Sequence, residues 1–289
     1  MHDRVLVLGG TQEARRLAAK LQQMPHVQLT YALAGRTSAP NTEGIDTNNV
    51  RRGGFGGTQG LATFLRTHNI SALIDATHPY ATQISDHALR ASESVHVAFI
   101  QLVRPTWQAE AQDRWTHVSS LAAAATTLQS WVPAGASLNV LLTCGNRGLD
   151  SFAKLQRIKL WTRLIEAPLH PLPSNVEKLY ARGPFDVERE RDTFRTLQVD
   201  IIVTKNSGGD ATRAKLQAAR ELGIRVVMIE RPATTHAAFV ESVDAALDWL
   251  TQYRSGDNTQ RREPADPSLP TAAPPHEADW SHPDGANRK

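Results

Sequence analysis

The chain has 289 residues, of which 40% are hydrophobic and 21% are charged, and its formal charge is +3 at pH 7. This composition is typical of a globular protein, and the small, scattered positive excess argues against a nucleic-acid surface while suiting a small anionic ligand. No stretch approaches the ~18 apolar residues of a membrane span, no signal peptide is recognisable, and Cys144 is the single cysteine. We therefore expect a cytoplasmic protein with no membrane partner, no disulfide framework and no cysteine-based metal site.

The first part of the chain alternates short apolar runs with amphipathic helical patterns. In chain order the predicted elements are strand 5–8, helix 12–22, strand 28–33, helix 61–67, strand 72–75, helix 83–92 and strand 97–102. Such an alternation favours βαβ units, in which helices cover both faces of a parallel sheet.

After Trp107 the rhythm restarts. The predicted elements are helix 121–131, strands 138–143 and 159–165, helix 187–197, strand 201–205, helix 212–222, strand 225–229 and helix 237–250. The restart predicts an α/β fold of two Rossmann-like lobes with mainly parallel sheets, over 1–106 and 107–254, and an active-site cleft between them. Residues 255–289 hold six prolines and almost no aliphatic side chains, which predicts a disordered tail.

The first predicted strand runs directly into Gly9 and Gly10, and a helix is expected to begin at about Thr11. Glycine lets the backbone turn sharply, and the free N–H groups and partial positive charge of a helix start suit a pyrophosphate. The pattern is a variant of the dinucleotide-binding fingerprint that lacks the full Gly-x-Gly-x-x-Gly spacing. A Gly-Gly turn that binds no nucleotide is the alternative.

The end of the second predicted strand favours NADP over NAD. This position carries no carboxylate for a ribose 2′-hydroxyl, and Arg36 and Thr37 stand where a 2′-phosphate would be bound. A solvated loop arginine is the alternative. Farther along, four of residues 53–57 are glycines, Gly54 among them, and this segment predicts a ligand wall or, alternatively, a flexible hairpin.

Polar residues also follow the strand 72–75, at the end where open α/β sheets place their ligands. His78 and Tyr80 are candidate contacts to nicotinamide or substrate, although a lone histidine is more often structural. In the C-terminal lobe, Asp210 is expected to cap a helix, and Arg147 and Arg182 occupy two further polar turns. A predicted anion cradle before that helix consists of Lys205, Asn206, Ser207 and Gly208. Several cationic turns in one lobe imply a ligand with several carboxylates.

Other chemistries lack their residues in this chain. A short-chain dehydrogenase needs Tyr-x-x-x-Lys, but Ile84 follows Tyr80 and Pro184 follows Tyr180 at that spacing. The phosphate loop of an NTPase and the His-Glu-x-x-His type of metal cluster are both missing from the sequence. Cys144 has no sequence partner that would mark it as a nucleophile, so we interpret it as a packed residue.

From Arg4 to about Leu250 the chain resembles the precorrin-6A reductase family, with its cobalt-precorrin-6A counterpart, in the order and spacing of its motifs. These are LGGTQEAR at 8–15, AGR at 34–36, GGFGG at 53–57, DATHPYA at 75–81, ARGPF at 181–185 and TKNSGG at 204–209. DATHPYA and TKNSGG are the most specific of them.

The resemblance implies reduction of one ring double bond of precorrin-6A to give precorrin-6B in cobalamin biosynthesis, with NADPH as donor and no bound metal or flavin. NADPH would lie in the N-terminal lobe, and the polycarboxylate tetrapyrrole would meet the cationic turns. His78, Tyr80 and Lys205 are candidate proton donors by chemical type. A non-catalytic tetrapyrrole or nucleotide carrier and an NADP reductase of small carbonyls stay open as alternatives. Whether the substrate contains cobalt also stays open, as does the oligomeric state.

Overall fold

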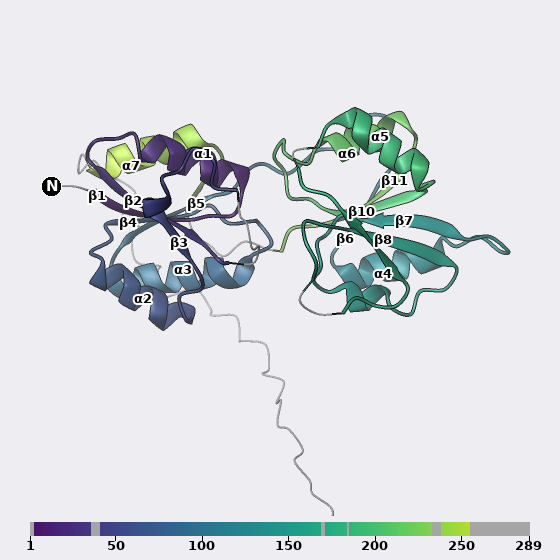
Figure 1. The fold of residues 1–289 in the computed structure, drawn as a ribbon, viewed down its shortest axis with the longest axis horizontal. Coiled ribbons are helices and arrows are strands. Elements are labelled where there is room, and N and C mark those ends of the chain that lie inside the picture. Colours follow the sequence, from purple (N-terminus) through teal and green to yellow (C-terminus); the bar gives the residue numbers. More distant parts are fainter. Residues whose placement is uncertain (1–2, 36–40, 169–170, 184, 233–237, 255–289) are drawn as a thin grey trace, which may run out of the picture.

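The computed structural model describes residues 3–35, 41–168, 171–183, 185–232 and 238–254, and these residues form two α/β lobes (Figure 1). Each lobe contains a six-stranded sheet, and every strand pair in both sheets is parallel. The predicted fold class is therefore confirmed. The predicted tail, 255–289, lies outside the described residues.

The first sheet has the strand order β12-β5-β4-β1-β2-β3. Its strands are β1 (Asp3–Leu8), β2 (Val27–Leu33), β3 (Val50–Arg52), β4 (Ala72–Asp75), β5 (Ala98–Leu102) and β12 (Phe239–Val240). Helices α1 (Gln12–Leu21) and α7 (Val243–Arg254) cover one face, and α2 (Gly57–Thr67) and α3 (Thr82–Val95) cover the other (Figure 1). The side chains of β1 alternate between the faces: Val5 and Val7 pack with α1 and α7, whereas Leu6 and Leu8 pack with α2 and α3.

The second sheet has the strand order β6-β11-β10-β7-β8-β9. Its strands are β6 (Trp115–Val118), β7 (Leu138–Leu142), β8 (Ile158–Leu164), β9 (Val176–Tyr180), β10 (Ile201–Lys205) and β11 (Arg225–Ile229). Helix α4 (Leu121–Ser130) covers one face, and α5 (Val187–Thr196) and α6 (Ala214–Glu221) cover the other (Figure 1). Two short 3-10 helices span Thr47–Asn49 and Leu149–Phe152.

The predicted lobe boundary is wrong for the end of the described chain. We placed residues 107–254 in one lobe, but β12 pairs with β5 and α7 packs against α1, so both belong to the first sheet. Ion pairs join α7 to that lobe: Lys20 Nζ lies 2.6 Å from Asp244 Oδ1, and Arg254 Nε lies 2.5 Å from Asp3 Oδ2. Periodicity predicts a helix from local residues, but it does not say which sheet the helix covers.

All four strands that the sequence did not reveal are edge strands. They are β3 and β12 in the first sheet and β6 and β9 in the second. Their residues are mostly half-buried or exposed, whereas β4 is buried throughout, so the edge strands lack the continuous apolar run that marks a central strand. The predicted cap of α6 is also wrong: the helix begins at Ala214 after Arg213, and no side chain caps it.

None of the described helices has both the length and the apolar character needed to cross a membrane.

Candidate active site

The turn after β1 leads into helix α1, at whose start the sequence predicts a pyrophosphate site. Thr11 is its N-cap: the Oγ1 atom accepts a hydrogen bond from the N–H of Ala14 at 3.0 Å and donates one to the carbonyl of Ala76 at 2.8 Å. The Thr11 hydroxyl is therefore already used. The N–H of Gly9 donates to the Ala32 carbonyl at 2.8 Å and that of Gly10 to the Tyr31 hydroxyl at 3.3 Å, so the N–H groups at the start of α1 itself are what this turn can offer an anion.

Glycine is suited to positions 9 and 10 of this turn for different reasons. A Cβ at Gly9 would lie 2.3 Å from the buried ring of Tyr31, so Gly9 is required by packing within the lobe. Gly10 has a φ of +114°, and no described atom lies within 4 Å of the position that its Cβ would take. The backbone at Gly10 is thus open to a ligand on the side where a pyrophosphate is expected.

The carboxyl end of β2 is where the 2′-phosphate site was predicted, but Arg36 and Thr37 lie outside the described residues. A neighbouring cation is described: Arg52 ends β3 in register with Leu33 of β2. Beside it, the Arg51 guanidinium donates to the carbonyls of Gly53 and Gly54 at 2.6 and 3.0 Å and so shapes the glycine-rich segment. Sequence reasoning missed Arg52, because β3 itself was not predicted.

The turn after β4 is held by the buried carboxylate of Asp75. Its Oδ1 accepts from the N–H and the hydroxyl of Thr77 at 3.0 and 2.7 Å, and its Oδ2 accepts from Gln101 Nε2 at 3.3 Å. Asp75 therefore fixes the start of the turn that carries His78 and Tyr80.

His78 is a neutral imidazole at physiological pH. Burial, with smaller contributions from the nearby cations Arg104, Lys205, Arg231 and Lys215, lowers the pKa of His78 to about 3. The backbone N–H of Tyr80 donates to Nδ1 at 3.3 Å, which leaves the proton of the neutral ring on Nε2. His78 can thus donate a hydrogen bond, but it is a poor source of a cationic proton.

Tyr80 links the two lobes. Its hydroxyl donates to the carbonyl of Ile229, at the end of β11, at 2.5 Å, and its ring packs against the core of the second sheet. Burial raises the pKa of the Tyr80 phenol well above its ordinary value. The contact brings the carboxyl edges of the two sheets together.

The predicted cations of the second lobe share that edge. Arg147 and Arg182 are exposed in the turns after β7 and β9, and Lys205 ends β10 with its Nζ 5.2 Å from the centre of the Tyr80 ring. Sequence reasoning missed Lys215 of α6, which is 4% exposed and whose Nζ lies 5.0 Å from the centre of the Trp107 ring. Burial lowers the pKa of Lys215 to about 8.

The remaining members of the predicted anion cradle make contacts within the chain. The Asn206 and Ser207 residues are 3% and 7% exposed. Asn206 Oδ1 accepts from the N–H of Trp107 at 2.9 Å, and its Nδ2 donates to the carbonyl of the same residue at 3.4 Å. Cys144, beside this region, is buried, and burial raises the pKa of its thiol to about 11, in keeping with a packed residue.

A small cavity of about 60 Å³ lies in the first lobe, between the turn after β4 and the starts of the two connections to the second lobe. It is lined by Asp75, Thr77, His78, Pro79, Thr82, Ser85, Gln101, Leu102, Val103 and Pro232. Binding sites for small molecules are typically ~300–1,000 Å³, so this cavity can hold only one part of a ligand. Among the described residues, no group of His, Cys, Asp or Glu is placed to hold a metal ion.

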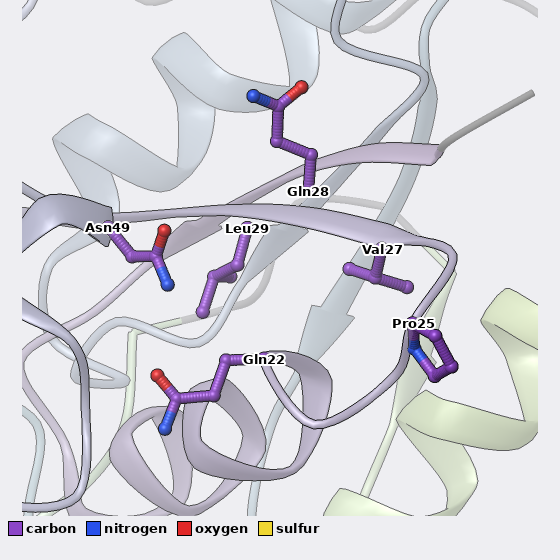
Figure 2. A pocket seen from close by; sticks show the side chains of 6 residues that line it. All are labelled: Gln22, Pro25, Val27, Gln28, Leu29 and Asn49. Carbon is purple, nitrogen blue, oxygen red and sulfur yellow. The ribbon is translucent and has the colours of Figure 1, made fainter.

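A larger hollow, of about 480 Å³, lies elsewhere in the first lobe (Figure 2). It is formed at the turn between α1 and β2 by Gln22, Pro25, Val27, Gln28, Leu29 and Asn49. This is the amino end of β2, opposite the edge that carries the glycine turn and His78. Ligands of parallel α/β sheets bind at the carboxyl ends of the strands, so we do not assign the reaction to this hollow.

Comparison with known proteins places the chain in a family. The family described as "Precorrin-6x reductase CbiJ/CobK" matches residues 4–251. A precorrin-6A reductase of Rhodococcus erythropolis is 42% identical over 248 residues, which cover 86% of this chain and 97% of the relative. A cobalt-precorrin-6A reductase of Priestia megaterium is 28% identical, over 84% of this chain and 98% of the relative. A solved structure of "CobK precorrin-6A reductase" is 37% identical and superimposes with a TM-score of 0.78, over 87% of this chain and 97% of that one.

Proposed function

Because the chain belongs to the precorrin-6x reductase family, we propose that it reduces precorrin-6A with a hydride from NADPH. Family and structure make it an oxidoreductase that acts on a ring double bond in cobalamin biosynthesis. The choice of cofactor, the metal content of the ring and the roles of single residues are the parts that we propose. The observation that carries the proposal is the meeting of the two carboxyl edges, one with an open glycine turn and the other with cations.

The first lobe fits a dinucleotide. Gly10 leaves space beside the N-terminus of α1. Because the N–H groups of Gly9 and Gly10 already donate to the Ala32 carbonyl and the Tyr31 hydroxyl, we propose that the amides at the start of α1 itself bind the pyrophosphate. NADPH supplies the hydride when bound. We propose Arg36 and Thr37, together with Arg52, as ligands of its 2′-phosphate, and the segment around Gly54 as a wall of the same site, because no described atom lies within 4 Å of a Cβ placed at Gly54.

The second lobe fits a polyanion. Arg147, Arg182 and Lys205 lie at or just after the carboxyl ends of three strands of one sheet, and arginine binds carboxylates bidentately. Lys215 adds a buried positive charge, and it makes no ion pair with a described carboxylate. A tetrapyrrole with acetate and propionate side chains is the substrate that such an edge suits.

Among the three candidate proton donors we favour Lys205. The Tyr80 hydroxyl is bonded to the Ile229 carbonyl, and His78 is neutral with one ring nitrogen engaged. Lys205 is half-buried at the carboxyl end of β10, and its ammonium lies over the Tyr80 ring. It can deliver a proton to the ring carbon beside the one that receives the hydride, and His78 Nε2 can donate a hydrogen bond to the ligand.

We propose the metal-free ring as the substrate. The precorrin-6A reductase of Rhodococcus erythropolis is 42% identical to this chain, whereas the cobalt-precorrin-6A reductase of Priestia megaterium is 28% identical. We also propose a cytoplasmic location, since the cofactor is an intracellular reductant.

Mass spectrometry of precorrin-6A after incubation with the purified protein tests this function. We expect a gain of two hydrogens that needs both protein and NADPH, with a smaller rate for NADH. Gain with the cobalt form alone would overturn the metal-free assignment, and tight binding without reduction of either form would favour a carrier. Arg36→Ala and Arg52→Ala, compared with Arg66→Ala on the exposed part of α2, test the 2′-phosphate ligands by the NADPH-to-NADH preference.

A further inference from the structure

The turn Asn206–Gly209 lies where the two connections between the lobes meet. The first connection leaves β5 and passes through Arg104, Pro105 and Trp107. Besides the two bonds between the Asn206 amide and the Trp107 backbone, the indole N–H of Trp107 donates to the carbonyl of Gly209 at 2.9 Å. Trp107 of this connection is therefore bonded to both ends of the turn, Asn206 and Gly209.

The second connection leaves β11 and reaches the same turn through Arg231. Its Nε donates to the carbonyl of Asn206 at 2.8 Å, and its Nη2 donates to the carbonyl of Ser207 at 2.9 Å. Nη2 also lies 3.3 Å from the carbonyl of Pro105 in the first connection. One guanidinium thus ties both connections to the turn.

The turn also contacts the start of helix α1. Arg104 donates from Nε to the carbonyl of Ser207 at 2.6 Å and from Nη1 to Glu13, in the first turn of α1, at 2.5 Å. The Arg104 and Glu13 side chains are only 14% and 18% exposed. A Cβ at Gly209 would lie 2.9 Å from Glu13 Oε1, so the helix and the turn are in direct contact.

We propose that this turn, with Arg104 and Arg231, is a clamp that sets the position of the second lobe relative to helix α1, and that Asn206 is its main positioning residue. The inference rests on the proposed function, in which the hydride donor and the ring are held by different lobes. Hydride transfer needs the reacting atoms ~3–3.5 Å apart, so a small shift between the lobes lowers the rate of the chemical step.

A direct role of Asn206 in anion binding predicts something different. Both polar atoms of its side chain are bonded to Trp107, and the residue is almost fully buried. As a clamp residue, Asn206 acts on the rate of hydride transfer. As an anion ligand, it would act on the affinity for the substrate.

The order of two variants separates these roles. Asn206→Asp keeps the acceptor for the Trp107 N–H and adds a negative charge, whereas Asn206→Ala loses both bonds. We expect Asn206→Ala to lower kcat by about 10- to 100-fold and Asn206→Asp by less, with the separately measured Kd values of NADPH and precorrin-6A within about threefold of wild type. Weaker substrate binding in Asn206→Asp than in Asn206→Ala, with kcat unchanged in both, would overturn the clamp.

A second pair of variants, with smaller changes, tests the clamp if Asn206→Ala does not fold. Trp107→Phe removes the bond to the Gly209 carbonyl. Trp115→Phe is its matched control, because the buried Trp115 Nε1 has no hydrogen-bond partner among the described residues. We expect faster amide hydrogen exchange across residues 104–110 and a severalfold lower kcat in Trp107→Phe alone. Equal exchange in both variants would refute the clamp. The exchange measurement needs no substrate, so it judges the clamp even if the wild-type protein reduces nothing.

Discussion

Substitution of Gly208 by alanine should destabilise the protein more than its backbone conformation alone requires. The residue has a φ of +66°, and a Cβ there would lie 1.9 Å from the carbonyl oxygen of Pro105. The left-handed conformation costs an alanine ~1–2 kcal/mol, and an overpacked contact that forces backbone to move costs ~1–3 kcal/mol. We expect Gly208→Ala to lower the free energy of unfolding by about 2–5 kcal/mol.

Gly223 provides the matched control. It lies in the same lobe with a φ of +65°, and no described atom lies within 4 Å of its Cβ position, so Gly223→Ala carries the conformational cost without the contact. The difference between the two variants, about 1–3 kcal/mol, then measures the close approach of the first connection. Calorimetry gives the comparison as a melting temperature, at ~2–4 °C for each kcal/mol in a chain of this size. Equal melting temperatures would refute the packing of Pro105 on the turn.

Three further variants test the candidate site. Tyr80→Phe removes the bond to the Ile229 carbonyl and should cost about 1–3 kcal/mol of stability while kcat stays within about threefold of wild type; a kcat loss of two orders of magnitude with unchanged amide hydrogen exchange across residues 104–110 would restore Tyr80 as the acid. His78 has a folded pKa of about 3, below its unfolded value, so the unfolded chain binds a proton first on acidification. The free energy of unfolding therefore falls from pH 6.5 down to about pH 3, by up to ~1.4 kcal/mol per pH unit. His78→Gln should flatten the acid side of a plot of unfolding free energy against pH, and an unchanged slope would contradict a buried neutral ring. Lys215→Met removes a buried charge whose folded pKa is lowered to about 8, so it should raise the melting temperature at pH 7 and weaken binding of the polyanion; a lower melting temperature would show that the ammonium has a stabilising partner.

The central strands and most helices could be predicted because their signals are local. A buried strand such as Ala72–Asp75 is a short apolar run wherever the chain places it, and Thr11 is a good N-cap by its own chemistry. Pairing between distant segments gives no local signal. The return of β12 to the first sheet therefore could not be predicted from residues near Phe239.

The same limit applies to the site. Asn206 and Gly208 suggest an anion cradle by residue type, yet the atoms that contact them belong to distant residues: Trp107 and Pro105, about a hundred positions earlier in the chain, and Arg231, 25 positions after Asn206. A turn that receives another segment of backbone needs the same small and amide side chains as one that receives an anion. Lys215 gave no signal at all, because a lysine on a helix is usually exposed.

The position of Tyr80 connects the clamp with the chemistry. Its hydroxyl is bonded to the Ile229 carbonyl, and Arg231, two residues farther along, carries the second connection to the Asn206 turn. The same ring supports Lys205, which directly precedes that turn. A shift of the lobes that broke the clamp would also move the ring away from Lys205, so the distance between donor and acceptor and the position of the proposed proton donor depend on one set of contacts. Variants of the clamp should therefore impair hydride transfer and protonation together, and a solvent isotope effect that stays at the wild-type value while kcat falls tenfold would separate the two steps and contradict this coupling.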